Sequence, residues 1–285
     1  YEPSKAQLIT TDLVNFVEAY EQLAPGVDTL DILQAHYFDK ASEGLQEYIK
    51  RHGLNVEVLV EAINESPEDY AAVSRFLEEA DSFKLKYIQL MKDYKEAMPS
   101  AVFPPTYLLV GANRGIAQAS RVGQFVTVVR NINRPTHQDR KLTTIAHELT
   151  HFQQARTLGF QQYTSTYQKE NNMLDLILRE GAAEFVAYYL VRKNVDSYER
   201  LDYVNERLDS LKVRFREDLA RLDASFWLWA SLNQKERPAL LGYTIGYKIC
   251  EAHYQKATDK ALALEDMLGI TEPNAFLEKS GFMED

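Results

Sequence analysis

The sequence predicts a mostly α-helical protein of the α+β class, with one small antiparallel β-sheet. Apolar residues recur at helical spacing through most of the 285 residues, which favours helices. Strand-like content, rich in β-branched and aromatic residues, is confined to a segment between 106 and 130. The overall composition, with 45% hydrophobic and 26% charged residues, is close to that of soluble globular proteins. A chain of this length can bury most of its apolar surface as one large domain or as two closely packed lobes.

The N-terminal third is expected to be helical. Capping residues and amphipathic spacing predict helices at 11–23, 30–38, 43–51 and 55–64. Ser66 as N-cap and Pro67 at the first helical position then predict a longer helix that runs to about Ala97. Two proline-containing stretches, Met98-Pro99 and Phe103-Pro104-Pro105, end this helix because proline cannot continue the helical hydrogen bonds.

Two strands are predicted in the segment that follows, at 106–110 and 124–129. The stretch between them is broken by glycines at 111, 115 and 123, and we expect the two strands to form the small antiparallel sheet. Helices return from Asp139 onwards. They are predicted at 139–157, 171–191, 198–221 and 239–256, with short ones at 259–268 and 273–279.

Charge and cysteine content exclude several classes of protein. The formal net charge is −10 and the basic residues are spread along the chain, whereas nucleic-acid binding needs clustered Lys and Arg, so no nucleic-acid partner is expected. No stretch approaches the roughly 18 consecutive apolar residues that span a bilayer. The single cysteine, Cys250, cannot form an internal disulfide. Any metal site would therefore consist of histidine and carboxylate ligands.

One of the predicted helices carries the HExxH pattern, His147-Glu148-Leu149-Thr150-His151. His147 and His151 lie one turn apart on the same helix face, so both imidazoles can reach one metal ion. Glu148 is rotated away from them and can address a metal-bound water without binding the metal. An apolar stripe lies nearly opposite, and the two histidines are therefore expected to face a cleft or solvent. This stripe consists of Leu142, Ile145, Leu149 and Phe152.

A second predicted helix, at 171–191, carries two glutamates at the edge of its apolar stripe. Glu180 and Glu184 are four residues apart, and like charges at this spacing destabilise a helix unless a cation or a hydrogen bond compensates. A zinc ion would be such a cation. Gly181 lies within the apolar stripe and lacks a side chain, so we expect another helix to approach closely at this point.

The HELTH run followed by REGAAEF, from Arg179 to Phe185, resembles the gluzincin group of zinc metallopeptidases. In that group an HExxH helix is completed by a Glu from a second helix. The resemblance implies that His147, His151 and Glu180 bind one zinc ion and that Glu148 is the general base. It also implies that Glu184 is an acidic hydrogen-bond partner of a ligating histidine. The metzincin pattern is excluded, because it requires Gly and His where Gln154 and Thr157 stand.

The wider chain resembles an uncharacterised bacterial family of predicted zinc-dependent proteases. The similar runs are HELTHFQQ, EGAAEF, LGYTIGYKI from Leu241 to Ile249 and AFLEKSGF from Ala275 to Phe282. The resemblance implies a single zincin-like domain over 1–285, with the sheet next to the HExxH helix. We expect a helical N-terminal portion at 1–100, the sheet and the metal-site helices at 101–195, and a helical C-terminal portion at 196–285.

The predicted function is zinc-dependent hydrolysis of peptide bonds in a peptide or protein substrate. Zinc acidifies its bound water, and Glu148 can take a proton from this water during attack on the carbonyl. Tyr243 and Tyr247 lie one turn apart on a predicted helix and are candidates for stabilising the oxyanion, with core packing of their rings as the alternative. The strand at 124–129 is expected to bind an extended peptide through its backbone.

Two other functions are left open by the sequence. One is a catalytically inactive, zinc-stabilised protein that binds a peptide or a partner at the bacterial envelope, and the other is a metal-free helical structural protein. The GAMEN-type run of gluzincin aminopeptidases is missing, which favours endopeptidase action. The chain begins at Tyr1 rather than Met. Together with the habit of the resembled family, this favours export in a bacterium, as a periplasmic, lipoprotein or secreted protein, with a cytoplasmic location as the alternative. No feature specifies an oligomeric state.

Overall fold

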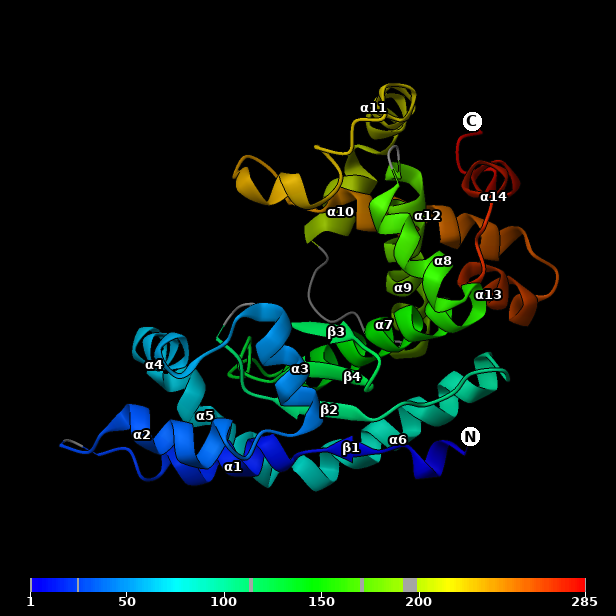
Figure 1. Cartoon of the computed structure of the whole chain (residues 1–285). Helices are drawn as coiled ribbons and strands as arrows, with labels where there is room; N and C mark the ends of the chain where they lie inside the picture. The colour runs from blue at the N-terminus through cyan, green and yellow to red at the C-terminus, as the bar shows by residue number, and fades with distance from the viewer. Residues whose placement is uncertain (1, 25, 113–114, 170–171, 192–198, 285) are drawn as a thin grey trace. The chain divides into compact units, whose positions relative to one another are not determined.

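Figure 1 shows a computed structural model of the chain, which describes residues 2–24, 26–112, 115–169, 172–191 and 199–284. Within these ranges the chain forms fourteen α-helices and one four-stranded sheet, so the predicted mostly α fold of the α+β class is confirmed. The chain divides into two compact units, Tyr1–Lys95 with Ala101–Leu149 and Glu96–Ser100 with Thr150–Asp285. The single zincin-like domain over 1–285 stays a prediction. Tyr1 and the expected first residues of the helices at 171 and 198 lie outside the described residues.

The helices that precede β2 in the chain lie close to their predicted positions. They are α1 (Thr11–Tyr20), α2 (Thr29–Leu33), α3 (Glu43–His52), α4 (Val56–Glu65), α5 (Pro67–Glu78) and α6 (Ala80–Ala97), with a 3-10 turn at Pro3–Lys5 and a π-helical turn at Gln34–Phe38. Side-chain caps begin three of them, α2, α3 and α4: the Asp28 carboxylate accepts from the Leu30 N–H, the Ser42 hydroxyl from the Leu45 N–H, and the Asn55 side-chain carbonyl from the Val58 N–H.

The long helix predicted from Pro67 to about Ala97 is interrupted at Glu79, which separates α5 from α6. Residues seven apart in a straight helix are about 10.5 Å apart along its axis. The rings of Phe76 and Phe83 nevertheless pack with their centroids 5.4 Å apart. The break allows both rings to enter the same core, where each is buried. No proline or glycine marks this position, so spacing alone did not predict it.

The sheet is mixed rather than antiparallel, so the predicted strand arrangement was wrong. Its strands are β1 (Leu8–Ile9), β2 (Thr106–Leu109), β3 (Ala117–Ala119) and β4 (Gln124–Thr127), in the spatial order β1-β2-β4-β3. β1 and β4 both pair with β2 in parallel, and only β3 is antiparallel, to β4. The reason is β3 itself, because this extra strand reverses the chain once more before β4 begins.

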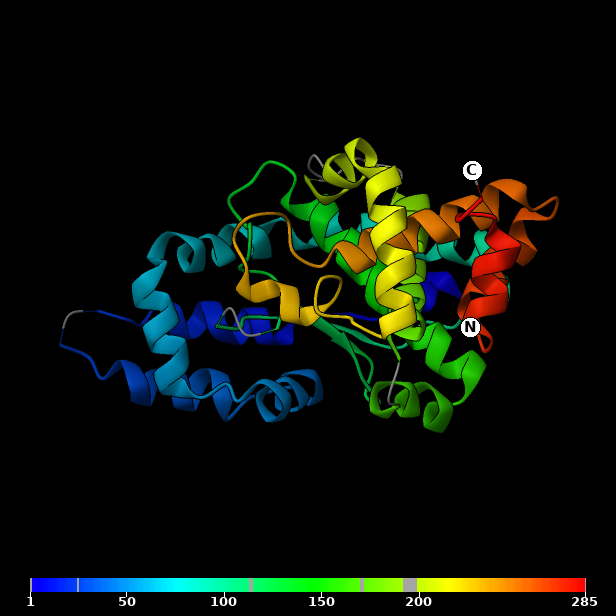
Figure 2. The same cartoon turned by 90° about the horizontal axis from the view of Figure 1, so that it is seen from above.

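Eight helices complete the described chain, and two of them, α9 and α12, pack along each other in the second unit. The eight are α7 (His137–Leu158), which begins in the first unit and ends in the second, α8 (Phe160–Ser165), α9 (Met173–Val191), α10 (Glu199–Glu206), α11 (Leu208–Arg221), α12 (Leu241–Lys256), α13 (Lys260–Leu268) and α14 (Pro273–Ser280), with 3-10 turns at Thr166–Gln168 and Trp229–Asn233. Helix α9 is buried on almost all sides, and α12 packs along it (Figures 1 and 2).

Glycines allow α9 and α12 to approach one another closely, as predicted from Gly181. A Cβ atom at Gly181 would overlap the backbone of Gly246 in α12, and a Cβ at Gly246 would overlap the carbonyl oxygen of Ile177 in α9. Both contacts would be well inside the 3.0 Å that real Cβ atoms respect. The backbones of the two helices therefore touch at these glycines. This contact fixes which side chains of α12 lie beside which residues of α9.

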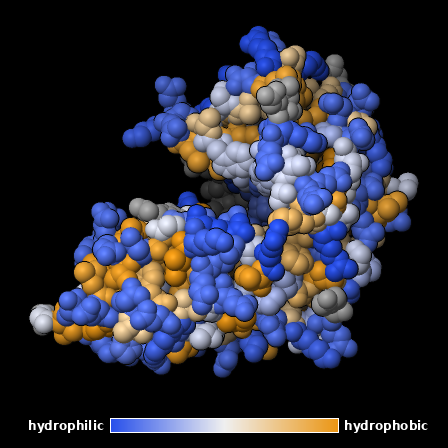
Figure 3. Space-filling view, in the orientation of Figure 1, coloured by the Kyte–Doolittle hydropathy of each residue, from blue (hydrophilic) through white to orange (hydrophobic). Residues whose placement is uncertain are grey.

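The surface of the first unit carries several apolar side chains (Figure 3). Around α2 and α4, Val27 is 45% and Leu30 is 42% exposed. A shallow groove here is lined by Leu30, Glu57, Val60, Glu61, Asn64 and Glu65. Among the helices that the structure describes, none combines the length and the hydropathy that crossing a membrane requires.

Candidate metal centre

Helix α7 is anchored by its apolar side and presents the HExxH residues on other sides. Leu142, Ile145 and Leu149 are buried as predicted, whereas Phe152 is half-buried. His147 is also half-buried, and His151 is 7% exposed. The imidazole of His151 is therefore buried rather than facing solvent. A metal ion bound to it would be held away from bulk water.

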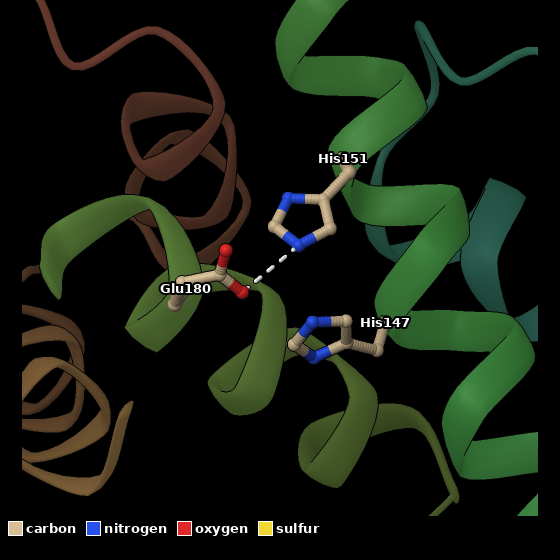
Figure 4. A group of neighbouring side chains, drawn as sticks. All are labelled: His147, His151 and Glu180. Atoms are coloured by element: carbon tan, nitrogen blue, oxygen red, sulfur yellow. Dashed lines mark hydrogen bonds and ion pairs between the residues drawn. The ribbon is translucent and has the colours of Figure 1, made fainter. Parts of the chain in front are cut away.

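Glu180 of α9 lies directly opposite His151. Its side chain is buried, with 5% of the residue exposed, and its Oε2 atom is 3.1 Å from Nε2 of His151. His147, His151 and Glu180 each offer one ligand atom, and these atoms all lie within 4.8 Å of one another. Figure 4 shows the three side chains pointing toward one another from α7 and α9. The structure thus brings together the three residues that sequence reasoning selected from separate helices.

The chemistry of these three residues fits a zinc ion. Zinc binds imidazole nitrogen and carboxylate oxygen at about 2.0–2.2 Å, and its catalytic sites commonly have three protein ligands and one open position. Tetrahedral ligands at that length are about 3.4 Å apart. The His151–Glu180 pair is close to this spacing, and the other separations, all within 4.8 Å, need a contraction of at most about 1.4 Å, which side-chain rotation can supply. A buried carboxylate also requires a compensating cation or hydrogen bonds.

Glu148 has a partner other than the two histidines. Its side chain is half-buried, and its Oε2 atom accepts a hydrogen bond of 2.9 Å from the backbone N–H of Ala119. Ala119 belongs to β3, which lies at the edge of the described sheet. The carboxylate of the predicted general base is therefore oriented by the backbone of an edge strand.

Glu184 lies one turn beyond Glu180, and its Oε1 atom accepts a hydrogen bond of 3.0 Å from the Arg200 guanidinium. The same guanidinium lies 5.6 Å from the centre of the Tyr243 ring. The role expected for Glu184, as the acidic partner of a ligating histidine, stays a prediction. The contact with Arg200 compensates the negative charge of Glu184, the second glutamate of the Glu180 and Glu184 pair.

Tyr243 and Tyr247, both on α12, have different surroundings. Burial raises the pKa of the Tyr243 hydroxyl, the negative charge of Glu180 raises it further, and the Trp229 side chain is hydrogen-bonded to it. Burial also raises the pKa of Tyr247, whose hydroxyl donates to Glu251 at 3.2 Å. The Tyr247 ring packs against Phe185 at a centroid distance of 5.6 Å. Of the two tyrosines, Tyr243 is the one influenced by the candidate metal ligand.

Two further tyrosines near Glu180 were missed by sequence reasoning. Tyr163 and Tyr167 flank the buried guanidinium of Arg179, which lies 4.3 Å and 5.2 Å from their ring centres. Burial raises the pKa of both hydroxyl groups, and the charge of Glu180 adds to the rise. Their spacing of four residues is the same signal that singled out Tyr243 and Tyr247, but no helix was predicted where α8 lies.

Comparison with known proteins places the chain in a family. The sequence model of a family described as predicted Zn-dependent protease (DUF2268) matches residues 108–270, more than half of the chain. The matched segment contains the second half of β2, all of β3 and β4, and the three candidate ligands. No curated protein matches the chain. No solved structure matches it either.

Proposed function

Since the chain belongs to this family of predicted Zn-dependent proteases, we propose that it is a zinc peptidase of the gluzincin type. His147, His151 and Glu180 bind a single zinc ion, and the substrate is a peptide or protein cleaved at internal peptide bonds. The observation that carries this proposal is the meeting of the three ligand atoms within 4.8 Å. The missing aminopeptidase run supports endopeptidase action.

Zinc in this position supplies a Lewis acid that polarises a carbonyl group and lowers the pKa of water to about 7. Glu148 acts as the general base, taking a proton from the attacking water and delivering it to the leaving amine. The N–H of Ala119 holds Oε2 of this carboxylate. Backbone donation of this kind fixes the direction from which the base can reach the water.

Tyr243 is the better candidate for stabilising the oxyanion. The indole N–H of Trp229 can only donate, so the Tyr243 oxygen accepts in their hydrogen bond. The Tyr247 hydroxyl instead donates its hydrogen bond to Glu251. Support for Tyr243 therefore comes from the influence of the Glu180 charge on its hydroxyl and from the different hydrogen-bond partners of the two tyrosines.

The backbone edge that would bind an extended substrate is that of β3. The strand at 124–129 was expected to do this, but β4 is paired on both sides, with β2 and with β3. Backbone groups of a strand alternate between its two edges, so Ala117 and Ala119 direct theirs away from β4. The bond from the Ala119 N–H to Glu148 agrees with this direction. A peptide paired with β3 would thus lie beside the general base.

Metal content and base substitution test the proposal together. We expect protein purified without chelators to contain one zinc per chain and to cleave fluorescein-labelled casein. Glu148→Gln should retain zinc and lose activity by about 100-fold to 10,000-fold, the range of a general base. Glu61→Gln, an exposed glutamate in the first unit, is the matched control and should behave like the parent. Zinc at less than one-tenth of the chain concentration, even after addition, contradicts the proposal. Equal behaviour of Glu148→Gln and the parent favours the inactive binding protein.

A further inference from the structure

The side chain of Gln154 connects the helix of the histidines to the helix of Glu180. Gln154 is on α7, one turn after His151, and only 2% of it is exposed. Its Oε1 atom is 2.9 Å from Nδ1 of His151, and its Nε2 atom donates to the backbone carbonyl of Arg179 on α9 at 3.0 Å. Arg179 directly precedes Glu180, so the bridge meets α9 beside the third candidate ligand.

These two contacts determine how the Gln154 amide is oriented. A backbone carbonyl only accepts hydrogen bonds, so the group that meets the Arg179 carbonyl must be the amide NH₂. The amide oxygen then faces His151, and this oxygen only accepts. The hydrogen of the neutral imidazole therefore lies on Nδ1, and the lone pair lies on Nε2.

We propose that Gln154 is a positioning residue that holds His151 in the Nδ1–H tautomer and so keeps its Nε2 atom available to a metal ion. Hydrogen bonding at one ring nitrogen commonly sets which nitrogen of a ligating histidine binds the metal. At Nδ1 of His151 this partner is a neutral amide on the same helix. The assignment of His151 as a ligand rests on the proposed function, whereas the tautomer does not.

The Nδ1–H tautomer determines how Nε2 of His151 interacts with Glu180. Nε2 of His151 and Oε2 of Glu180 are 3.1 Å apart, and in the Nδ1–H tautomer both atoms are acceptors. Two buried acceptors at this distance repel each other unless a cation or an additional proton lies between them. By withholding the Nε2 proton, Gln154 leaves the pair in need of a positive charge, and a metal ion supplies it.

Arg179 holds the α9 end of the bridge in place. Its buried guanidinium donates to the backbone carbonyl of Tyr163 and to the hydroxyl of Thr166, both at 2.8 Å. Because the side chain is fixed by these bonds and by the two tyrosine rings, the neighbouring carbonyl that receives the Gln154 amide is fixed as well. The Gln154 amide therefore ties α7 to a fixed point of α9 at the level of the ligands.

The first test measures the tautomer in metal-free, full-length protein labelled with ¹⁵N-histidine, using long-range ¹H–¹⁵N correlations at pH 8. We expect His151, assigned by the loss of its signals in His151→Asn, to be the Nδ1–H tautomer. In Gln154→Leu it should shift to Nε2–H, because Oε2 of Glu180 then becomes the nearest acceptor. Gln154→Glu keeps an acceptor and should restore Nδ1–H. An Nε2–H parent, or an unchanged tautomer in Gln154→Leu, overturns the proposal.

The second test measures zinc affinity by competition with a chromophoric chelator. Gln154→Leu should bind zinc about 10-fold to 100-fold more weakly than the parent, as for other hydrogen-bond partners of ligating histidines. Gln154→Glu should recover most of this loss, which a purely structural role of the amide does not explain. Gln153→Leu removes an amide buried to the same 2% on the same helix and should keep the parent affinity. Equal affinities of Gln154→Leu and the parent overturn the proposal.

The two tests separate this proposal from the peptidase proposal. A parent protein that binds no zinc contradicts the peptidase, while the tautomer of His151 still decides the role of Gln154. A parent that binds zinc but shows His151 as Nε2–H overturns the role of Gln154 and leaves the peptidase supported.

Discussion

Tyr243 and Tyr247 lie one turn apart on α12, and hydrogen bonding separates their roles. The Tyr243 oxygen receives a bond from Trp229 and is influenced by the charge of Glu180. The Tyr247 hydroxyl is bonded to Glu251, and its ring lies in a cluster with Phe185. A buried hydroxyl influenced by the charge of a candidate metal ligand suits a developing negative charge, whereas one that donates to a carboxylate beside its own packed ring suits packing.

Replacing each tyrosine by phenylalanine tests this distinction. Tyr243→Phe should lower kcat by about 100-fold to 1,000-fold with KM nearly unchanged, because an oxyanion donor acts only in the transition state. Tyr247→Phe keeps the packed ring and should change kcat by less than about threefold. Steady-state kinetics of the zinc-loaded variants on a fluorogenic peptide measure both values. Similar losses of kcat in the two variants would show that the Tyr243 hydroxyl does not stabilise the oxyanion.

At the scale of the helices, the contact between α9 and α12 positions several residues at once. Gly181 and Gly246 allow the two backbones to touch. Glu180 and Tyr247 are the sequence neighbours of these glycines, and Tyr243 is one turn before Gly246. Any change in the separation of the two helices therefore moves a candidate ligand relative to the tyrosine that is proposed to act with it.

Gly246→Ala should destabilise the protein, although Ala is the better helix former by up to about 1 kcal/mol. The new methyl would meet the backbone carbonyl of Ile177, which cannot move aside as a side chain can. A loss of about 1–3 kcal/mol in the free energy of unfolding is expected from such overpacking, measured by urea denaturation. Gly269→Ala is the control, since its nearest contact is a Thr157 methyl at 3.3 Å. A Gly246→Ala variant as stable as the parent would mean that the helices separate easily.

The elements differ in how far the sequence predicts them. Long helices such as α9 and α12 have enough residues for a 3.6-residue period to be recognised. β3 has only three residues, Ala-Gln-Ala, without the β-branched or aromatic side chains that mark a strand. Its pairing depends on β4 rather than on its own composition, and missing it led to the wrong strand directions and the wrong substrate-binding edge.

At the scale of the whole molecule, metal binding and folding are expected to be coupled. The candidate ligands come from two helices that are distant in the sequence, so an ion that binds them links α7 to α9. A ligand that binds only the folded state raises its stability in proportion to the logarithm of the ligand concentration relative to Kd. The gain is about 2.7 kcal/mol at 100 times Kd.

Removing zinc should therefore lower the midpoint of thermal unfolding by several degrees. Adding EDTA to the zinc-loaded protein gives the metal-free value, and calorimetry with and without excess chelator measures the difference. His151→Ala lacks a candidate ligand and should show a much smaller zinc-dependent shift. His36→Ala, a half-buried histidine elsewhere, should keep the full shift. A parent midpoint that does not respond to zinc or EDTA would contradict the coupling.

The candidate site was predictable where its signal is local in the sequence. His147, Glu148 and His151 are recognised by spacing within one helix, and Glu180 by its place on a second helix and by the resemblance. Gln154 carries no such signal, because its contacts depend on which helix packs against α7 and on which residue of that helix lies opposite. The same holds for Tyr163, whose position follows from the stacking on Arg179. Long-range packing decides both.

The bond between Glu148 and the backbone of Ala119 also bears on the association of separate chains. An open strand edge offers unpaired donors and acceptors to any other extended segment, including that of a second chain, and charged side chains at such edges discourage this pairing. The carboxylate covers one donor of β3 and brings a negative charge to it. Replacing Glu148 with alanine would remove the cover and invite self-association, whereas glutamine keeps an oxygen over the strand. Gel filtration of the two variants should therefore differ, with glutamine the safer choice for capturing a bound peptide.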